Sequence, residues 1–252
     1  MERWAGKVAI VTGASAGIGA TVAEKLVRSG LVVVGLARRV ERIQTLANSL
    51  VASNAPGKLY GVKCDMTQES DILKAFQWTT SNVGKVHILI NNAGANLGGN
   101  LIDGITDNWR TMFEINVIGL LIATREAIKI MRENNIDGHI VNVNSVAGHT
   151  SIYIPSFNVY PATKHAVTNL SHCLRDEITA QGLNVKVTSV SPGLVQTEFF
   201  TEENLPQESA DMFKGWPYLE AKDVADTILY VLSTPPEVHI GELTLRPKRS
   251  PA

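Results

Sequence analysis

Cysteine is scarce in this sequence, and neither sign of charge is in excess. The 252 residues include only Cys64 and Cys173, which cannot form a disulfide framework and lack the spacing of a metal site. We therefore expect both to be reduced core residues of an intracellular protein that holds no metal. The 23 Lys and Arg residues nearly balance the 24 Asp and Glu residues, so bulk electrostatics give no reason to expect nucleic acid or an anionic membrane as a partner.

Long apolar runs are also absent. The densest apolar stretch is interrupted by Arg125, Glu126 and Lys129, and nothing approaches the roughly 18 consecutive apolar residues of a membrane span. The first apolar run, residues 8–11, is shorter than the core of a secretory signal, and the closing letters PKRSPA match no retention or peroxisomal signal. We expect a cytoplasmic protein without a stable membrane anchor.

Short strand-like runs alternate with helix-like segments along the whole chain. The apolar, β-branched runs are 8–11, 32–36, 59–64, 86–90, 139–143, 185–190 and 242–245. The segments with helical periodicity are 18–29, 42–52, 69–81, 107–133, 160–179 and 221–232. Strands that are apolar on both faces, separated by amphipathic helices, predict an α/β fold. We expect a Rossmann-type, doubly wound parallel sheet of about seven strands with helices on both faces.

Neither an internal repeat nor a linker rich in Pro, Gly or Ser divides the sequence. With 44% hydrophobic and 19% charged residues, the chain has enough apolar surface for one large core. We therefore expect a single domain across residues 1–252. The one long irregular stretch, about residues 192–216, is expected to be a loop over an active site rather than a linker.

A glycine-rich loop follows the first predicted strand. Residues 12–19 read TGASAGIG and place Gly13, Gly17 and Gly19 between a predicted strand and a predicted helix. Glycines here allow a tight turn, close backbone approach to a pyrophosphate and tight packing of helix on strand, and the helix N-terminus attracts phosphate. Turns of small residues also occur without a ligand, but the strand–loop–helix context favours nucleotide binding.

The glycine spacing G-x3-G-x-G differs from the G-x-G-x-x-G fingerprint, and TGxxxGIG resembles the signature of the short-chain dehydrogenase/reductase family. Further residues typical of this family follow in the family's order within residues 6–246. They are Asp65, Asn91, Asn92, Ala93, Gly94, Asn116, Ser145, Tyr160, Lys164, Pro192, Gly193 and Thr197. The resemblance implies an oxidoreductase that transfers a hydride between a nicotinamide cofactor and an alcohol/carbonyl pair.

The end of the second predicted strand indicates which nicotinamide nucleotide binds. NAD-specific folds usually place Asp or Glu there to accept a hydrogen bond from the ribose 2′-hydroxyl, whereas this sequence has Ala37 followed by Arg38 and Arg39. A guanidinium suits a 2′-phosphate, so we expect NADP, held mainly by Arg38 with Ser15 as a hydroxyl donor. The family often adds a basic residue where this chain has Ala16, and the two arginines could also be a solvated helix start.

Tyr160 and Lys164 lie four positions apart on a predicted helix and so share a face. An unperturbed tyrosine titrates near pH ~10, and a nearby lysine cation favours the phenolate. The resemblance implies that Tyr160 exchanges the proton with the substrate, and that Lys164 holds the nicotinamide ribose and lowers the tyrosine pKa. It also implies that Ser145 binds the substrate oxygen and that Asn116 holds a water. Taken singly, each residue could instead have an ordinary structural role.

The resemblance also implies where the cofactor touches the chain. The implied contacts are Gly13, Ser15, Ala16, Gly17, Ile18, Gly19, Arg38, Arg39, Asp65, Met66, Asn91, Ala93, Gly94, Tyr160, Lys164, Pro192, Gly193, Val195 and Thr197. Asn91 could equally stabilise the sheet, and Gly193 could be only a turn glycine.

Apolar residues before Tyr160 and in the 192–216 stretch are expected to wall a substrate pocket. They are Ile152, Tyr153, Ile154, Phe157, Phe199, Phe200, Met212, Phe213 and Trp216. Such a lining suits a lipophilic alcohol or carbonyl compound, although each residue could instead serve the core or an oligomer contact. His149 is expected to be structural or solvated.

Segments such as VVGLARR, TREAIKIM and GHIVNVNSVAGH resemble a subgroup of animal family members that includes insect farnesol dehydrogenases and vertebrate dehydrogenase/reductase member 11. This resemblance implies an NADP-dependent enzyme for a terpenoid alcohol such as farnesol, with a hydroxysteroid dehydrogenase or a broad carbonyl reductase as the alternative. A non-catalytic NADP(H)-binding sensor is a more distant alternative, because such relatives typically lose the tyrosine or lysine that this chain keeps. The predicted helices 107–133 and 160–180 are expected to pack against a second subunit in a homodimer or homotetramer.

Overall fold

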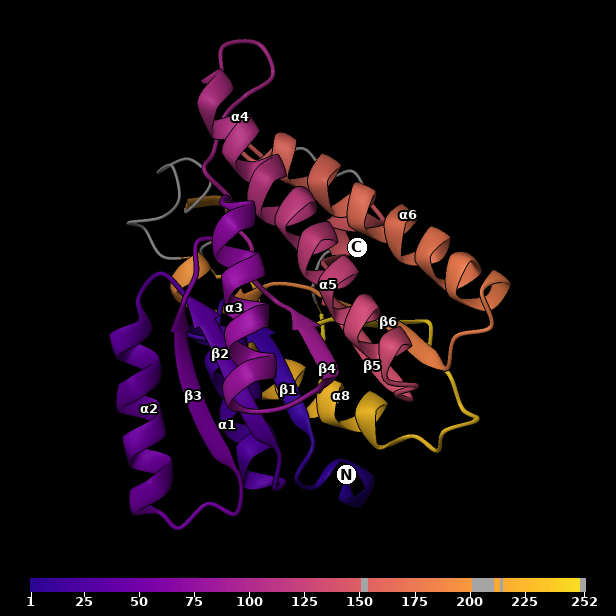
Figure 1. Ribbon diagram of the computed structural model, residues 1–252. Helices are drawn as coiled ribbons and strands as arrows, with labels where there is room; N and C mark the ends of the chain where they lie inside the picture. The colour runs from indigo at the N-terminus through magenta and orange to yellow at the C-terminus, as the bar shows by residue number, and fades with distance from the viewer. Residues whose placement is uncertain (151–153, 201–210, 214, 250–252) are drawn as a thin grey trace.

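The computed structural model describes residues 1–150, 154–200, 211–213 and 215–249, and strands and helices alternate along them (Figure 1). The strands of the main sheet are β1 (Val8–Thr12), β2 (Val32–Ala37), β3 (Lys58–Lys63), β4 (Val86–Asn91), β5 (Gly138–Val143), β6 (Val185–Pro192) and β9 (Glu242–Leu245). The α-helices are α1 (Gly17–Arg28), α2 (Val40–Ala52), α3 (Glu69–Asn82), α4 (Thr106–Phe113), α5 (Leu120–Glu133), α6 (Val159–Ala180) and α8 (Ala221–Ser233). Short helical turns are η1 (Glu2–Trp4), η3 (Val146–Gly148) and η4 (Glu198–Phe200).

The seven strands form one parallel sheet in the order β3-β2-β1-β4-β5-β6-β9. This confirms the expected doubly wound architecture, and each expected strand is found within two residues of its predicted ends. The direction of winding reverses between β1 and β4. Ligands of such sheets bind beyond the carboxyl ends of the strands at this reversal, and the glycine loop after β1 lies there.

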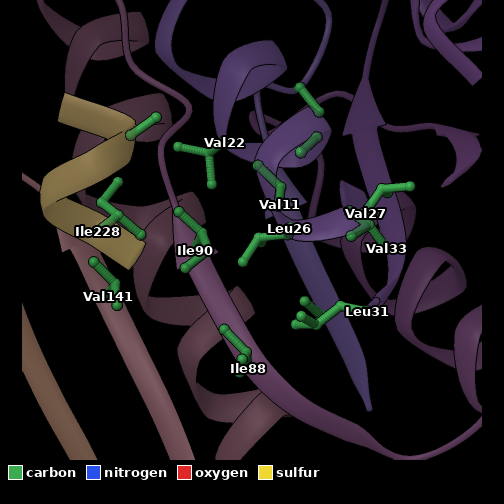
Figure 2. Close-up of a cluster of buried hydrophobic side chains, with 14 of the residues drawn as sticks. Val11, Val22, Leu26, Val27, Leu31, Val33, Ile88, Ile90, Val141 and Ile228 are labelled. Atoms are coloured by element: carbon green, nitrogen blue, oxygen red, sulfur yellow. The ribbon is translucent and has the colours of Figure 1, made fainter. Parts of the chain in front are cut away.

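Both faces of the sheet are covered because successive residues of each strand point to opposite sides. Ile88 and Ile90 of β4 pack in the cluster that includes side chains of α1 and α8, whereas Leu89 packs in the cluster beneath α3, α5 and α6. Figure 2 shows Ile88 and Ile90 on the same side of the sheet as Ile228 of α8 and Leu26 of α1. This two-sided burial explains why the strand sequences are apolar throughout rather than alternating.

The continuous helix expected at 107–133 is interrupted. Between α4 and α5, residues Glu114–Gly119 form a π-helical turn, η2. Asn116 lies within this turn and is 1% exposed. Gly119, at its end, lies so close to the Met66 carbonyl oxygen that a side chain there would collide with it. π-Turns within helices are frequent at functional sites, and this one carries a residue that the sequence had singled out.

Further observations bear on the expectations. Cys64 is buried as expected, but Cys173 is exposed because the helical period places it on the outer face of α6. The 192–216 stretch contains a short strand, β7 (Val195–Gln196), which pairs in parallel with β8 (Leu219–Glu220) beyond the end of that stretch. Among the described residues, no helix combines the length and apolar character needed to cross a membrane. That same part of the chain holds no cluster of three or more His, Cys, Asp or Glu placed to bind a metal ion.

Candidate active site

A cavity of about 450 Å³ opens along the carboxyl ends of the strands. The loops after six different strands contribute to it, so residues far apart in the sequence meet there. The predicted site residues that line it are Gly13, Ser15, Ala16, Gly17, Ile18, Arg38, Arg39, Asp65, Met66, Ala93, Gly94, Ser145, Tyr160, Lys164, Pro192, Gly193, Val195 and Thr197. Gly19, Asn91 and Asn116 lie behind this lining.

The glycine loop has the backbone that a phosphate cradle needs. Gly13 and Gly17 have φ values of +68° and +54°, a region that favours glycine. A Cβ on Gly13 would lie 2.9 Å from Ala93 Cα, and one on Gly19 would collide with the Gly13 carbonyl oxygen. Ala16 gives no side-chain cap to the start of α1, so the loop and helix N-terminus are suited to hold the pyrophosphate of a dinucleotide.

The two adjacent asparagines after β4 have different positions. The Asn91 Nδ2 donates to Thr124 Oγ1 and to Asn142 Oδ1, both at 2.9 Å, and the residue does not line the cavity. Its side chain therefore joins β4 to β5 and α5, which favours the sheet-stabilising interpretation. Asn92, which was not among the implied cofactor contacts, lines the cavity and donates from Nδ2 to the Thr12 carbonyl oxygen at 2.9 Å.

Two arginines and a glutamate lie together at the end of the cavity beside β2. Arg38, Arg39 and Glu198 all line it. The Arg39 Nη2 lies 3.2 Å from Glu198 Oε2, and the Arg42 Nη1 lies 2.7 Å from Glu198 Oε1. Sequence reasoning missed Glu198 and Arg42, because nothing in a local pattern joins residues 156 positions apart.

Tyr160 and Lys164 lie on α6 at the opposite end of the cavity, and both are buried. The Lys164 Nζ donates to the Val143 carbonyl oxygen at 3.0 Å and lies 5.6 Å from the centroid of the Tyr160 ring. Burial raises the pKa of Tyr160, while a hydrogen bond with Ser145 acts in the opposite direction. Burial lowers the pKa of Lys164 to about 8.

In the structure, the hydrogen bond with Ser145 lowers the pKa of Tyr160, and loss of hydration of the phenolate outweighs this effect. Tyr160 therefore holds its proton at neutral pH. Such a group is suited to donate a proton and to take it back only as a substrate oxygen delivers it. The expected lowering of the Tyr160 pKa by Lys164 stays a prediction.

Asn116 acts on the loop after β4. Its Oδ1 accepts from the Ala95 N–H at 2.7 Å, and its Nδ2 donates to the Ala95 carbonyl oxygen at 2.9 Å and to Thr163 Oγ1 at 3.0 Å. These contacts hold the loop beside α6, close to the catalytic candidates. The side-chain amide is thus engaged with protein groups rather than directed into the cavity, and the expected water-holding role stays a prediction.

A smaller, mainly apolar cavity of about 90 Å³ adjoins the first, and Ser145 and Gly193 line both. Of the residues expected to wall a substrate pocket, Ile154, Phe157, Phe213 and Trp216 line this second cavity. Phe199 lines the first cavity, and Met212 is 36% exposed. Ile152, Tyr153 and the Phe200 side chain lie outside the described residues. His149 contacts Ser191 at 2.9 Å and Glu242 at 3.2 Å, in line with a structural role.

The chain is similar to known proteins along most of its length. Residues 7–208 match the family model described as short chain dehydrogenase. The chain is 45% identical to farnesol dehydrogenase of Aedes aegypti over 98% of each chain. It is 44% identical to dehydrogenase/reductase SDR family member 11 of Gallus gallus, again over 98% of each. A serine dehydrogenase solved in its closed form with NADP+ shares 31% identity at a TM-score of 0.84, covering 94% of both chains.

The family model covers most of the chain, and these relatives cover nearly all of it. The parallel sheet is the one that the sequence pattern predicted, and the glycine loop, Tyr160 and Lys164 line one cavity at its edge. The chain belongs to the short-chain dehydrogenase/reductase family of oxidoreductases.

Proposed function

We propose that the protein transfers a hydride between NADP(H) and a lipophilic alcohol/carbonyl pair, with a terpenoid alcohol such as farnesol as the first candidate substrate. The observation that carries this proposal is the position of Ser145 at the junction of two cavities. Ser145 lines both the larger cavity, which the glycine loop also lines, and the smaller apolar cavity. Tyr160 shares a hydrogen bond with Ser145, and Lys164 lines the larger cavity with them. Cofactor and substrate would therefore meet beside the hydroxyl groups of Ser145 and Tyr160.

NADP is proposed over NAD because of the residues at the end of β2. Ala37 leaves no carboxylate to accept from a ribose 2′-hydroxyl, and Arg38 and Arg39 line the cavity there. A guanidinium recognises a phosphate with charge-assisted hydrogen bonds. The structure of the serine dehydrogenase relative contains NADP+, which supports the same choice. The whole chain would then serve as one NADP-binding domain.

The nicotinamide ring, when bound, supplies or accepts the hydride. In carbonyl reduction the Tyr160 hydroxyl would donate its proton to the substrate oxygen and become a phenolate. In alcohol oxidation the Tyr160 phenolate, formed by prior loss of the phenol proton, would accept the proton of the alcohol. Ser145 would hold the same oxygen by a second hydrogen bond. Lys164, whose ammonium lies beside Gly94 and the Tyr160 ring, would hold the nicotinamide ribose. The raised pKa of Tyr160 keeps the proton on the phenol until the reaction needs it.

The substrate proposal rests on the second cavity and on the relatives. Phe157, Phe213 and Trp216 give that cavity an apolar wall, which suits an isoprenoid chain and excludes water from the hydride step. Similarity to farnesol dehydrogenase supports an acyclic terpenoid alcohol. Similarity to dehydrogenase/reductase member 11 supports the alternative, a hydroxysteroid dehydrogenase or broad carbonyl reductase.

We also propose a homodimer or homotetramer, formed through the helices at 106–133 and 159–180. Phe113, Ile118 and Leu121 are exposed apolar side chains on the first of these segments, which favours a subunit contact there. A cytoplasmic location stays a prediction from the sequence.

The test is a panel of farnesol, geraniol, a hydroxysteroid and a short alcohol with purified protein. Each is offered with NADP+ and with NAD+, and the absorbance of the reduced nicotinamide is followed. Turnover of farnesol with NADP+ is expected, and an Arg38→Asp variant is expected to lose affinity for NADP+. An Arg38→Asp variant with unchanged NADP+ affinity would contradict the cofactor assignment. If the nucleotide binds but no alcohol is turned over, carbonyl reduction with NADPH is measured next, and inactivity there as well would indicate the non-catalytic sensor.

A further inference from the structure

The segment Val195–Phe199, which we call the crossing segment, contributes Val195, Thr197, Glu198 and Phe199 to the lining of the larger cavity. Thr197 contacts the glycine loop, since its Cβ lies 3.2 Å from where a Cβ on Gly17 would be. Glu198 pairs with Arg39 and Arg42 beyond β2. The Phe199 ring lies 5.6 Å from the Tyr160 ring, centroid to centroid. Three consecutive residues thus touch three different parts of the proposed cofactor site.

Glu198 is shared unequally between its two arginines. Both of its oxygens accept from the Arg42 Nη1, at 2.7 and 3.0 Å, whereas the Arg39 Nη2 reaches only one oxygen, at 3.2 Å. Arg39 and Glu198 line the cavity, but Arg42, one turn further along α2, does not. The hydrogen bond with Arg42 holds the pKa of Glu198 below its usual range, so the side chain is a carboxylate at neutral pH.

This arrangement places an anion of the protein where the proposed cofactor would bring an anion of its own. A 2′-phosphate at the end of β2 needs the guanidinium groups of Arg38 and Arg39. One of these, Arg39, already donates to Glu198. A phosphate and a carboxylate within reach of the same guanidinium also repel each other.

We propose that Glu198 is a specificity-determining residue that competes with the adenosine 2′-phosphate for Arg39, and that Arg42 restrains this competition by drawing Glu198 away. The inference rests on the proposed NADP-binding function. NADH carries a neutral hydroxyl in place of the 2′-phosphate, so Glu198 penalises NADPH and leaves NADH nearly unaffected. The pair Glu198–Arg42 then sets how strongly the enzyme prefers one nicotinamide nucleotide over the other.

The test is a double-variant cycle of wild type, Glu198→Gln, Arg42→Met and the two combined. Each is titrated with NADPH and with NADH by the change in nucleotide fluorescence, and thermal melts check that each variant folds. All three side chains are about half exposed, so the effects expected are those of exposed ion pairs, roughly two- to fivefold.

Glu198→Gln is expected to tighten NADPH about two- to fivefold and to leave NADH unchanged. Arg42→Met is expected to weaken NADPH binding by a similar factor, because Glu198 then loses its hydrogen bonds with Arg42, which are shorter than the one with Arg39, and competes more strongly for Arg39. In the Glu198→Gln background, Arg42→Met should have no further effect, since there is no carboxylate left to restrain.

Three results would overturn the proposal: Glu198→Gln weakening NADPH, Glu198→Gln changing NADPH and NADH equally, or Arg42→Met acting as strongly without Glu198 as with it. Either of the first two results would mean that the Glu198–Arg42 ion pair only stabilises the crossing segment. The third result would mean that Arg42 itself binds the 2′-phosphate. Failure of the wild type to bind either nucleotide would contradict the proposed function itself, which separates the two claims.

Discussion

Asn116 holds the backbone of Ala95 from both sides, accepting from its N–H at 2.7 Å and donating to its carbonyl oxygen at 2.9 Å. The same amide reaches Thr163 on α6, one residue before Lys164. Asn116 lies within the π-helical turn η2. One side chain therefore sets the loop after β4 against the helix that carries both Tyr160 and Lys164.

Replacing Asn116 with Asp removes the donor and leaves its oxygen facing the Ala95 carbonyl and Thr163 Oγ1. We expect the free energy of unfolding to fall by about 1–3 kcal/mol, the cost of an unsatisfied buried polar group. Urea denaturation measures this change. Asn48→Asp on the exposed face of α2 keeps the oxygen that accepts from Gln44 and serves as the control, with an expected change within about 0.5 kcal/mol. Equal effects at the two positions would contradict the role given to Asn116.

The glycine loop gives a second prediction. A Cβ at Gly19 would collide with the Gly13 carbonyl oxygen and the Asn92 amide, so Gly19→Ala must displace the loop or the start of α1. We expect a loss of stability of about 1–3 kcal/mol and weaker nucleotide binding, measured by urea denaturation and by NADPH titration. Gly182 has a φ of +64° with open space around it, so Gly182→Ala should cost about 1 kcal/mol without altering binding. Unchanged NADPH affinity in Gly19→Ala would argue against a phosphate cradle.

Much of the fold could be predicted because strand and helix signals here agree with burial. Successive residues of β4, such as Ile88, Leu89 and Ile90, are apolar although they point to opposite faces of the sheet. Such a strand needs helices on both sides of the sheet to bury its side chains. The interruption of the 107–133 helix could not be predicted, because a single π-turn changes the hydrogen bonding of one turn and the residue types alone do not specify that change. The strands β7 and β8 could not be predicted either, because a strand of two residues is too short to show an alternation of apolar and polar residues.

Some residues of the candidate site could likewise be predicted from the sequence, and others could not. Residues in ordered motifs, such as Ser145, Tyr160 and Lys164, meet where the resemblance implied. The sequence could not separate the roles of Asn91 and Asn92, because a one-residue shift at the end of β4 decides which side chain faces the cavity. Glu198 and Arg42 meet only through the tertiary fold. The pKa of Tyr160 depends on burial, which no motif states.

The buried lysine gives a prediction for pH dependence. The pKa of Lys164 is about 8 in the folded protein against an ordinary value of 10.5. Between these values the unfolded chain keeps a proton that the folded chain has lost, so stability should rise with pH by at most about 1.4 kcal/mol per pH unit. The raised pKa of Tyr160 acts in the opposite direction only above its ordinary value of 10. The informative window is therefore pH 8 to 10.

Urea denaturation of the cofactor-free protein across that window tests this expectation. Lys164→Met serves as the matched variant, because it has similar length and no titrating group. The wild type should gain stability relative to Lys164→Met as the pH rises, by a total on the order of 1–2 kcal/mol. Parallel curves for the two proteins would show that Lys164 is not held in a desolvated site.

The central claim is that the Tyr160 hydroxyl exchanges the proton that accompanies hydride transfer with NADP(H). The most direct measurement is the initial rate of NADP+ reduction by farnesol in the wild type and in Tyr160→Phe, each saturated with NADP+. The account predicts a fall in turnover of about 10²- to 10⁴-fold, with the dissociation constant for NADPH nearly unchanged. A Tyr160→Phe enzyme that binds NADPH and turns over farnesol at the wild-type rate would contradict it.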